Sequence, residues 1–297
     1  MAQTLSRYRR KSESPARDYR PHIRRRRREM AAMTQPRPAP FDALAESYDR
    51  IFTDSLIGRA QRSATWRHLD STFLPGQRVL ELNCGTGEDA LHLAERGVRV
   101  DAFDISPAMI AVANRRLAAS RRLPVRFAVL ATEELGAIDS VYDGAFSNFG
   151  GLNCVKDLRQ VAANLARLVR PLGHVVLCLA SRFCVWETAW WLAHGKPAKA
   201  FRRLHKGGTT AELRAGSVVH VQYSPVRELR RLFAPEFSLV ALQGIGLFVP
   251  PSYVEPYARR FPRLLSAAER VDGLLNSLPG LRGVADHVLL TFRRVPQ

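Results

Sequence analysis

The 297-residue sequence has few of the features that mark metal-binding, membrane-spanning or secreted proteins. Its cysteines are few and do not have the paired spacing of a zinc site. They are Cys84, Cys154, Cys178 and Cys184. The longest apolar runs, such as HVVLCLA at 174–180, are too short to cross a bilayer. An apolar core of roughly 7–15 residues, as in a secretory signal, is also missing. We therefore expect reduced thiols, no metal ion and a cytoplasmic protein.

Negative charge is also scarce, and the excess of positive charge is concentrated at one end. The chain has 45 Lys and Arg against 27 Asp and Glu, a net charge of +18. Residues 1–32 hold eleven basic and three acidic side chains, a net charge of +8, without apolar periodicity. We expect residues 1–40 to be disordered. They are interpreted either as an arm that binds nucleic acid through its phosphates, or as residues upstream of the true translation start at Met30 or Met33.

Residues 41–297 are expected to form a single α/β domain, because short apolar segments alternate with amphipathic ones. Helices are expected over 41–52 and 55–70, and another over 155–173 that ends at Pro171 and Gly173. The strands expected in the first half are 77–83, 98–106, 124–131, 142–149 and 174–180. This order predicts a doubly wound parallel sheet, with a ligand cleft beyond the carboxyl ends of the strands.

Two insertions, at about 182–216 and 248–282, interrupt the second half, where strands are expected at 217–224, 237–248 and 285–295. In the first insertion, four aromatic side chains have the spacing of one helical face. They are Phe183, Trp186, Trp190 and Trp191. This face is interpreted either as a helical lid over a hydrophobic acceptor, resting on an anionic membrane surface, or as ordinary packing of a helix against the core.

A glycine-rich turn follows the first expected strand. Gly85, Gly87 and Ala90 have the spacing of a dinucleotide fingerprint, and Asp104 stands where an acid would bind a ribose. Glu81 argues against a dinucleotide, because a pyrophosphate at a helix N terminus requires positive potential. A nicotinamide oxidoreductase is therefore disfavoured.

A carboxylate at this turn suits a cationic nucleoside cofactor instead. S-adenosylmethionine (SAM) carries an ammonium and a sulfonium group and no phosphate. Asp104 can accept hydrogen bonds from both ribose hydroxyls, and Asn83 stands where a left-handed backbone is useful. The alternative is that Glu81 only caps the edge of a strand.

Four segments in the expected order carry a family resemblance. VLELNCGTGEDALHLAERGVRVDAFDIS resembles motif I and the acidic loop of class I SAM-dependent methyltransferases. The similarity is to their small-molecule branch, which includes the ubiquinone/menaquinone and malonyl-carrier-protein methyltransferases. ALAESYDRIF resembles the leading helix of that branch, YDGAFSNFGGLNCV its fourth-strand motif, and NLARLVRPLGHVVL its passage into the fifth strand. The resemblance covers residues 41–181. It implies a Rossmann-like, mostly parallel sheet with an antiparallel C-terminal strand, SAM as methyl donor, and no obligate protein partner.

The resemblance also implies roles for individual residues. Tyr48 would border the methionine carboxylate, Asp104 would bind the ribose diol and Ile105 would pack on adenine. The methionine and ribose portions would contact Glu81, Asn83, Gly85, Thr86 and Gly87. The cleft beside the transferred methyl would be lined by Ser147, Asn148 and Phe149. Two positions depart from the family pattern: Asn83 replaces its first glycine, and Ala131 replaces an acid. Thr132 or backbone groups would then hold the adenine amino group.

The function expected from these observations is methyl transfer to a small, hydrophobic acceptor. No catalytic residue is assigned; His220 is the histidine expected to face the cleft, and Glu187, His194 and His205 are weaker candidates for a base. A nucleic-acid or protein methyltransferase remains an alternative, although SNFGGL stands where amino-methylating enzymes of nucleic acids carry a Pro-Pro-aromatic motif. A catalytically silent SAM-binding module is also left open.

Overall fold

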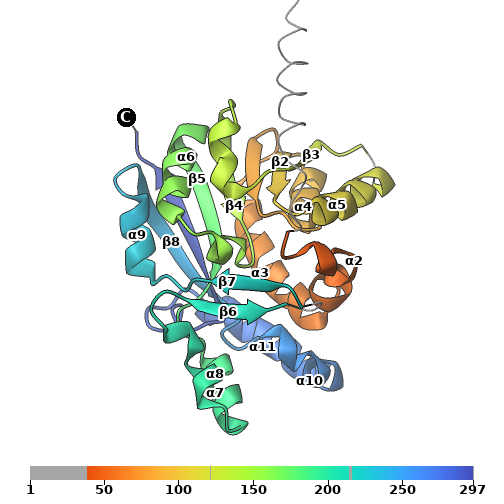
Figure 1. The fold of residues 1–297 in the computed structure, drawn as a ribbon, viewed down its shortest axis with the longest axis vertical. Helices are drawn as coiled ribbons and strands as arrows, with labels where there is room; N and C mark the ends of the chain where they lie inside the picture. Colours follow the sequence, from red (N-terminus) through yellow and green to blue (C-terminus); the bar gives the residue numbers. More distant parts are fainter. Residues whose placement is uncertain (1–38, 121, 214–215, 297) are drawn as a thin grey trace, which may run out of the picture. The chain divides into compact units, whose positions relative to one another are not determined.

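The computed structural model describes residues 39–120, 122–213 and 216–296. The predictions for residues 1–38 therefore lie outside the described residues. Ala39 and Pro40, which were expected to be disordered, are described, and Ala39 is buried. A seven-stranded sheet with the order β3-β2-β1-β4-β5-β9-β8 forms the centre of the described fold (Figure 1). Its strands are β1 (Arg78–Leu82), β2 (Arg99–Asp104), β3 (Val125–Val129), β4 (Tyr142–Ser147), β5 (Val169–Ala180), β8 (Phe237–Ile245) and β9 (His287–Arg294). The first five strands pair in parallel, and β9 runs antiparallel to both β5 and β8. The predicted Rossmann-like sheet with an antiparallel C-terminal strand is confirmed.

Helices cover both faces of the sheet, because successive strand residues point to opposite sides. Leu80 and Leu177 pack into a core with α6 and α9, whereas Val79 and Val176 pack into a second core with α3, α4 and α5. These helices are α3 (Leu56–Thr72), α4 (Glu88–Glu95), α5 (Pro107–Ala119), α6 (Leu158–Leu168) and α9 (Val226–Phe233). Two closed cores hold the strand ends in fixed positions.

Two expected helix boundaries were wrong. The leading segment is not one helix but a 3-10 turn η1 (Asp42–Leu44), a short α2 (Ala45–Tyr48) and a π-helical turn η2 (Asp49–Thr53). Helix α6 ends at Leu168, and the chain continues directly into β5 rather than to Gly173. The strand register shifts opposite this stretch, so Pro171 lies at an irregularity where a missing N–H is tolerated.

The second half of the chain adds smaller elements around this sheet. Those of the first insertion are α7 (Val185–Ala193), α8 (Pro197–Ala200), η5 (Arg202–Leu204) and the strand β6 (Thr209–Glu212). The predicted strand at 217–224 is shorter, β7 (Val218–Val221), and pairs with β6 in a separate hairpin that the sequence did not indicate. The remaining short elements are η3 (Thr132–Ala137), η4 (Gly151–Cys154), η7 (Ser252–Val254), α10 (Glu255–Arg260) and α11 (Pro262–Leu275). None of the helices in the described part of the chain has the length and apolarity to cross a membrane.

Candidate active site

A cavity of about 200 Å³ opens beyond the carboxyl ends of the parallel strands. We call it the first cavity. Eight of the residues predicted from the sequence line it: Tyr48, Asn83, Gly85, Asp104, Ile105, Thr132, Asn148 and Phe149. Residues that the sequence did not single out complete the wall, namely Pro40, Phe41, Met109, Glu133, Gly150, Gly151, Cys154, Val155 and Val219.

The glycine-rich turn forms the floor of this cavity because of its backbone conformation. Asn83 and Gly85 have φ values of +56° and +54°, the left-handed region in which Asn and Gly are tolerated best. A Cβ atom added at Gly85 would meet nothing within 4 Å, so this glycine leaves space at the cavity wall. A Cβ added at Gly151 would lie 2.3 Å from the Cβ of Asn83, so the loop after β4 packs directly on the turn.

The side chain of Asn83 connects three strand ends. Its Nδ2 donates to Thr132 Oγ1 at 3.0 Å, and its Oδ1 accepts from Ser147 Oγ at 3.3 Å. Thr132 follows β3 and Ser147 ends β4, so an asparagine at this position has a structural role that glycine would not supply. The departure from the family pattern at residue 83 is thus accommodated within the turn.

Asp104 is held at the end of β2 by the backbone. Its Oδ2 accepts from the Gly85 N–H at 2.9 Å, and its Oδ1 accepts from the Ser106 N–H at 2.8 Å. Burial raises the pKa of Asp104, and the two backbone hydrogen bonds oppose that effect. Ile105, directly beside it, is 45% exposed at the cavity. A carboxylate and an apolar side chain are therefore presented together.

The other predicted residues do not line the first cavity. Ser147 is buried beneath Asn83, and Thr86 donates to Asp49 Oδ1 at 2.7 Å. Gly87 starts α4, and a Cβ there would lie 2.5 Å from the ring of Phe127.

Glu81 is also fully buried, and its Oε2 has no hydrogen-bond partner among the described residues. Burial and the neighbouring Asp89 raise the pKa of Glu81 well above its usual range, although Arg62 opposes them. The carboxyl is thus a proton-binding group behind the glycine-rich turn.

The electrostatic character of the first cavity is negative. Asp104 and Glu133 line it, and none of its described lining residues is Lys or Arg. The nearby cation Arg62 is compensated, because its Nη1 lies 2.6 Å from Asp89 Oδ2 in a buried ion pair. Such a cavity opposes a phosphate and favours a ligand with positive charge. This lining fits SAM, whose sulfonium and ammonium groups are cationic.

A second cavity, of about 380 Å³, adjoins the first. Its described lining is Phe41, Leu44, Tyr48, Ile51, Phe52, Gln61, Phe149, Glu212, Leu213, Ser252, Asp286 and His287. The two cavities share Phe41, Tyr48 and Phe149. Phe149 has a φ of +48°, an uncommon conformation for an aromatic residue and one that concentrates at functional sites.

The histidine expected to face the cleft was the wrong one. His220 lines neither cavity; it is exposed and its Nε2 contacts the Gly207 carbonyl at 2.7 Å. Its neighbour Val219 lines the first cavity instead, because successive strand residues face opposite sides. The residue that sequence reasoning missed is His287 at the start of β9. The only indication of His287 in the sequence is that an acid, Asp286, precedes it at the start of an expected strand, and this is a weak indication of a functional residue.

The weaker candidates for a base have other surroundings. His194 is exposed, with Nδ1 at 2.7 Å from the Trp190 carbonyl oxygen, and His205 is exposed as well. Glu187 is buried and forms ion pairs with Arg202 at 2.6 Å and Arg203 at 2.7 Å. Its carboxylate is therefore a structural group in this fold. Among the described residues, no three His, Cys, Asp or Glu side chains are grouped to hold a metal ion.

The tryptophan-rich helix α7 lines neither cavity. Trp190 packs against Tyr253 and Tyr257, with ring centroids 5.8 Å apart in both pairs. Trp191 lies beside Lys196 and Lys199. The expected lid over the acceptor was wrong for this helix; the β6–β7 hairpin contributes Val219 and Glu212 to the cavity walls instead.

Known proteins match both the sequence and the fold. Residues 79–173 match the family model of a methyltransferase domain. A demethylmenaquinone methyltransferase of Clavibacter sepedonicus is 35% identical over 47% of this chain and 56% of its own length. A malonyl-[acyl-carrier protein] O-methyltransferase of Serratia marcescens is 30% identical over 58% of this chain and 64% of its own. The chain thus spans less than two thirds of each of these relatives.

Solved structures share the fold at low sequence identity. A SAM-dependent methyltransferase from Mesorhizobium loti is 17% identical, with a TM-score of 0.52 over 80% of this chain and all of its own. A phosphoethanolamine N-methyltransferase from Haemonchus contortus, in complex with SAM, is 17% identical, with a TM-score of 0.54 over 86% of this chain and 57% of its own. The family match shows that residues 79–173 belong to a methyltransferase domain, and the solved structures share its fold.

Proposed function

We propose that this chain transfers the methyl group of SAM, bound in the first cavity, to a small apolar acceptor in the second. One observation carries the proposal. A cavity with two carboxylates and no basic residue in its described lining shares an aromatic wall with a second, largely apolar cavity. A cationic donor and an apolar acceptor would meet at that wall, which consists of Phe41, Tyr48 and Phe149.

The residues of the first cavity suit the parts of SAM as the family resemblance implies. Asp104 would accept hydrogen bonds from the ribose diol, and Ile105 would pack on the adenine. Thr132 lies where the adenine amino group would be held. Asn83 and Gly85 would lie along the methionine and ribose portions, with Glu81 behind them as a counter-charge for the ammonium.

The chemistry that the bound cofactor supplies is an electrophilic methyl group on a sulfonium. Methyl transfer from it is an in-line displacement, so alignment and exclusion of water contribute much of the rate. Phe149 and Tyr48 supply apolar surface on both sides of the shared wall. Phe149 is fixed by an edge-on contact with Phe52, with centroids 5.0 Å apart, and by the Arg62 guanidinium 4.9 Å from its ring centroid. These contacts hold the wall rigid.

The acceptor class follows from the second cavity. Six of its twelve described lining residues are aliphatic or Phe, and none is Lys or Arg. The names of the relatives describe a quinone and a carrier-bound malonyl acceptor, which are different chemistries. The lining here favours an apolar ring over a dicarboxylate, because it offers an anion no Lys or Arg and the Glu212 carboxylate would repel it.

Calorimetric titration tests the proposal. We expect the full chain to bind SAM and its demethylated product S-adenosylhomocysteine, and not NADH. Binding of NADH alone would contradict the proposal, because a pyrophosphate would then occupy a cavity with negative lining.

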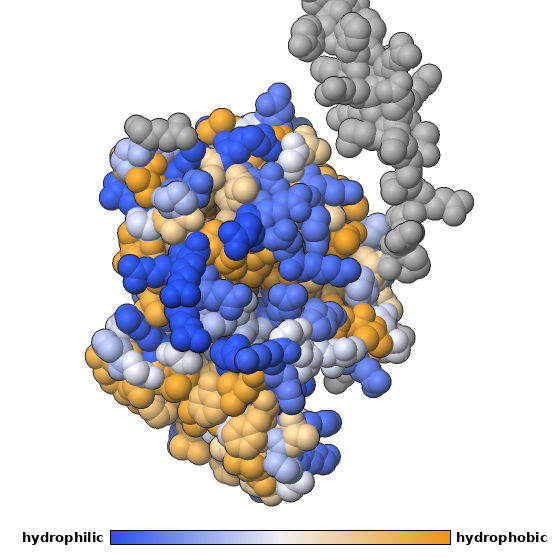
Figure 2. Space-filling view, turned by 60° about the vertical axis from the view of Figure 1, so that its left-hand side comes forward, coloured by the Kyte–Doolittle hydropathy of each residue, from blue (hydrophilic) through white to orange (hydrophobic). Residues whose placement is uncertain are grey.

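We further propose that helix α7 contacts an anionic membrane surface. Its one buried side chain is Glu187, while Val185 and Leu192 are 45% and 47% exposed. Apolar side chains gather at the lower end of the molecule in Figure 2, where α7 and α8 lie in Figure 1. Glu187 is the only acid between residues 185 and 206; apart from the two arginines that pair with it, this stretch holds Lys196, Lys199 and Lys206. An apolar surface flanked by positive charge suits anionic lipid.

Vesicle flotation tests this contact. The chain should float with vesicles that contain phosphatidylglycerol, less at high salt, and not with pure phosphatidylcholine. Leu192→Asp should reduce flotation, whereas Val218→Asp, at a residue of similar exposure on β7, should not. Equal flotation of the two variants would contradict a role for α7.

A further inference from the structure

His287 stands in the wall of the second cavity beside the shared aromatic residue. Its ring meets Phe149 edge-on, with centroids 5.7 Å apart. Phe149 also lines the first cavity, so His287 is one side chain away from the bound donor of the proposed function. It is the only histidine in the described lining of either cavity.

The two ring nitrogens of His287 have different surroundings. Nδ1 is buried without a hydrogen-bond partner and lies 3.4 Å from Asp286 Oδ2. Nε2 makes no hydrogen bond within the described residues. A carboxylate next to Nδ1 favours the tautomer with its proton there. The lone pair of Nε2 is then the free basic site of the side chain.

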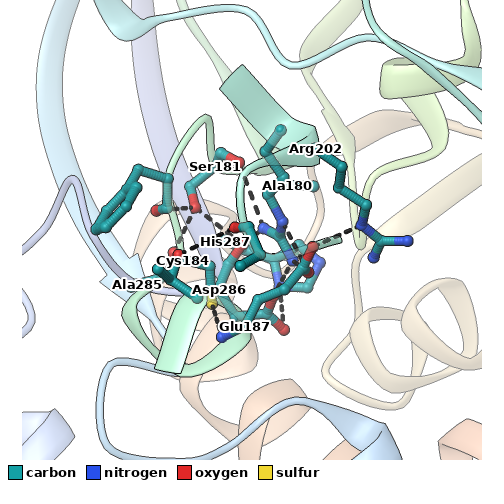
Figure 3. Close-up of polar contacts among 12 residues, drawn as sticks. Ala180, Ser181, Cys184, Glu187, Arg202, Ala285, Asp286 and His287 are labelled. Atoms are coloured by element: carbon teal, nitrogen blue, oxygen red, sulfur yellow. Dashed lines mark hydrogen bonds and ion pairs between the residues drawn. The ribbon is translucent and has the colours of Figure 1, made fainter. Parts of the chain in front are cut away.

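Asp286 is itself fixed in place. Its Oδ1 accepts from Arg203 Nη2 at 2.7 Å, and its Oδ2 accepts from Gln61 Nε2 at 3.3 Å. The same Arg203 donates to Glu187 Oε2 at 2.7 Å and to the Asp286 carbonyl at 2.8 Å. Figure 3 shows His287, Asp286 and Glu187 within this network, together with Ser181, which donates to the Ala285 carbonyl. Connected ion pairs of this kind leave Asp286 little freedom.

We propose that His287 is the general base of the methyl transfer, that Asp286 positions it, and that the acceptor is an apolar ring with an ionisable hydroxyl group. The proposal rests on the proposed function and adds to it the class of acceptor. Nε2 of His287 takes the hydroxyl proton. The electron pair released attacks the methyl carbon through the oxygen or a conjugated ring carbon. The carbon–sulfur bond breaks, and its electron pair stays on sulfur as a neutral thioether.

The protonation states agree with this role. Burial lowers the pKa of His287 and Arg203 lowers it further, although Asp286 opposes them. Burial would raise the pKa of Asp286, but the Arg203 guanidinium and the hydrogen bonds from Arg203 and Gln61 lower it, so the carboxyl stays ionised. Tyr48 and Glu212 are the other titratable groups in the cavity lining. The imidazole is thus neutral at pH 7 and can accept a proton.

A base also discriminates between acceptors. A phenol or hydroquinone must lose a proton to become a good nucleophile, whereas a carboxylate is already ionised. The Glu212 carboxylate repels an anionic acceptor, for which the described lining offers no Lys or Arg, and leaves a neutral hydroxyl unaffected. The cavity is therefore selective for a neutral, protonated acceptor.

Matched naphthalene probes test the proposal with the full chain and SAM. The hydroxyl probes are 1-naphthol and 1,4-naphthohydroquinone, the anionic probe is 1-naphthoate, and methylated products are measured by mass spectrometry. The variants are His287→Gln and Asp286→Asn, with His220→Gln as the matched control.

We expect methylation of the hydroxyl probes, reduced about 10²–10⁴-fold in kcat by His287→Gln, with an unchanged Kd for SAM. In the wild type, kcat/KM should decrease as the pH drops below the pKa of His287, which lies under the usual His value of 6.5. His287→Gln should remove this pH dependence. Asp286→Asn should shift the apparent pKa, a change that lost stability alone would not produce.

Three results would overturn the inference. The first is wild-type rates in His287→Gln. The second is methylation of 1-naphthoate in preference to the hydroxyl probes. The third is the absence of product from both hydroxyl probes while SAM binds normally. Failure to bind SAM at all would instead contradict the proposed function, so the two failures are distinguishable.

Discussion

The two cavities of this protein differ in how they are built, although they share three side chains. The first is lined largely by segments that directly follow β1, β2, β3 and β4. The second takes its walls from the leading turns, α3, the β6–β7 hairpin and the start of β9, segments far apart in the sequence. The first is shaped by backbone conformation at a glycine-rich turn, whereas the second is held by side-chain ion pairs.

Each cavity is supported by a buried arginine. Arg62 forms an ion pair with Asp89 behind the first, and Arg203 joins Glu187 and Asp286 behind the second. Cofactor binding and acceptor chemistry are therefore separable by mutation. The predictions below test that separation.

The largest expected effect comes from Arg203→Met. Removing this guanidinium leaves Asp286 buried without a counter-charge and Glu187 with Arg202 as its remaining partner, which should lower the free energy of unfolding by about 3–5 kcal/mol. Urea unfolding measures the loss. Arg202→Met is the control, because Arg202 is 38% exposed and also pairs with Glu187; its effect should be less than about 1 kcal/mol. Equal effects would contradict a special role for Arg203.

Asp104→Ala should weaken the binding of SAM in the first cavity and leave the second cavity unchanged. Loss of hydrogen bonds to a charged group costs about 1.5–3 kcal/mol, so the Kd for SAM should rise roughly 10- to 150-fold. Calorimetry measures the change, with Glu212→Ala as a control in the second cavity. An unchanged Kd would refute the proposed contact with the ribose.

Substitution of two glycines in the turn should separate packing from binding. Gly87→Ala places a Cβ 2.5 Å from the Phe127 ring at a φ of +79°, which should cost about 1–3 kcal/mol of stability. Gly85→Ala places its Cβ in open space at the cavity, so stability should fall less while SAM affinity falls more. Thermal unfolding and calorimetry measure the two effects. Equal losses of stability would contradict this assignment.

The smallest effect is a pH dependence of SAM binding. The pKa of Glu81 is raised mainly by burial, so its carboxyl stays protonated at pH values at which an ordinary glutamate is ionised. A cationic ligand lowers that pKa, and the complex releases a proton; SAM affinity should therefore increase as pH rises through the raised pKa. Calorimetry in buffers of different ionisation enthalpy counts the protons. The release should vanish in Glu81→Gln and persist in Glu133→Gln.

Local sequence patterns predicted the sheet and about half of the residues that line the first cavity. The apolar segments 77–83 and 142–149 became β1 and β4, and the left-handed turn expected at Asn83 is present. These features depend on neighbours within a few residues of each other. The break of the leading segment into a π-helical turn was not predicted, because it depends on how that segment packs on other parts of the fold.

The second cavity could not be predicted from the sequence, because the residues that line it are far apart in the chain. His220 and His287 both occupy alternating strands, and the sequence alone favoured His220. Only the pairing of β9 with β5 and β8 places His287 beside Phe149. Of the four aromatic residues expected on one helical face, Trp186, Trp190 and Trp191 lie in α7, whereas Phe183 precedes it. The buried residue of α7 is Glu187, which pairs with two arginines that follow the helix.

The sequence by itself therefore determined the parallel sheet, the glycine-rich turn and the cofactor class, since short-range periodicity and backbone preferences suffice for these. The tertiary structure alone decided which histidine faces the acceptor cavity and which side of α7 is buried. Those outcomes depend on ion pairs and strand pairings between residues that are far apart in the sequence, such as Arg203 with Asp286 and Val175 with Phe292. Periodicity in a single segment carries no information on such partners.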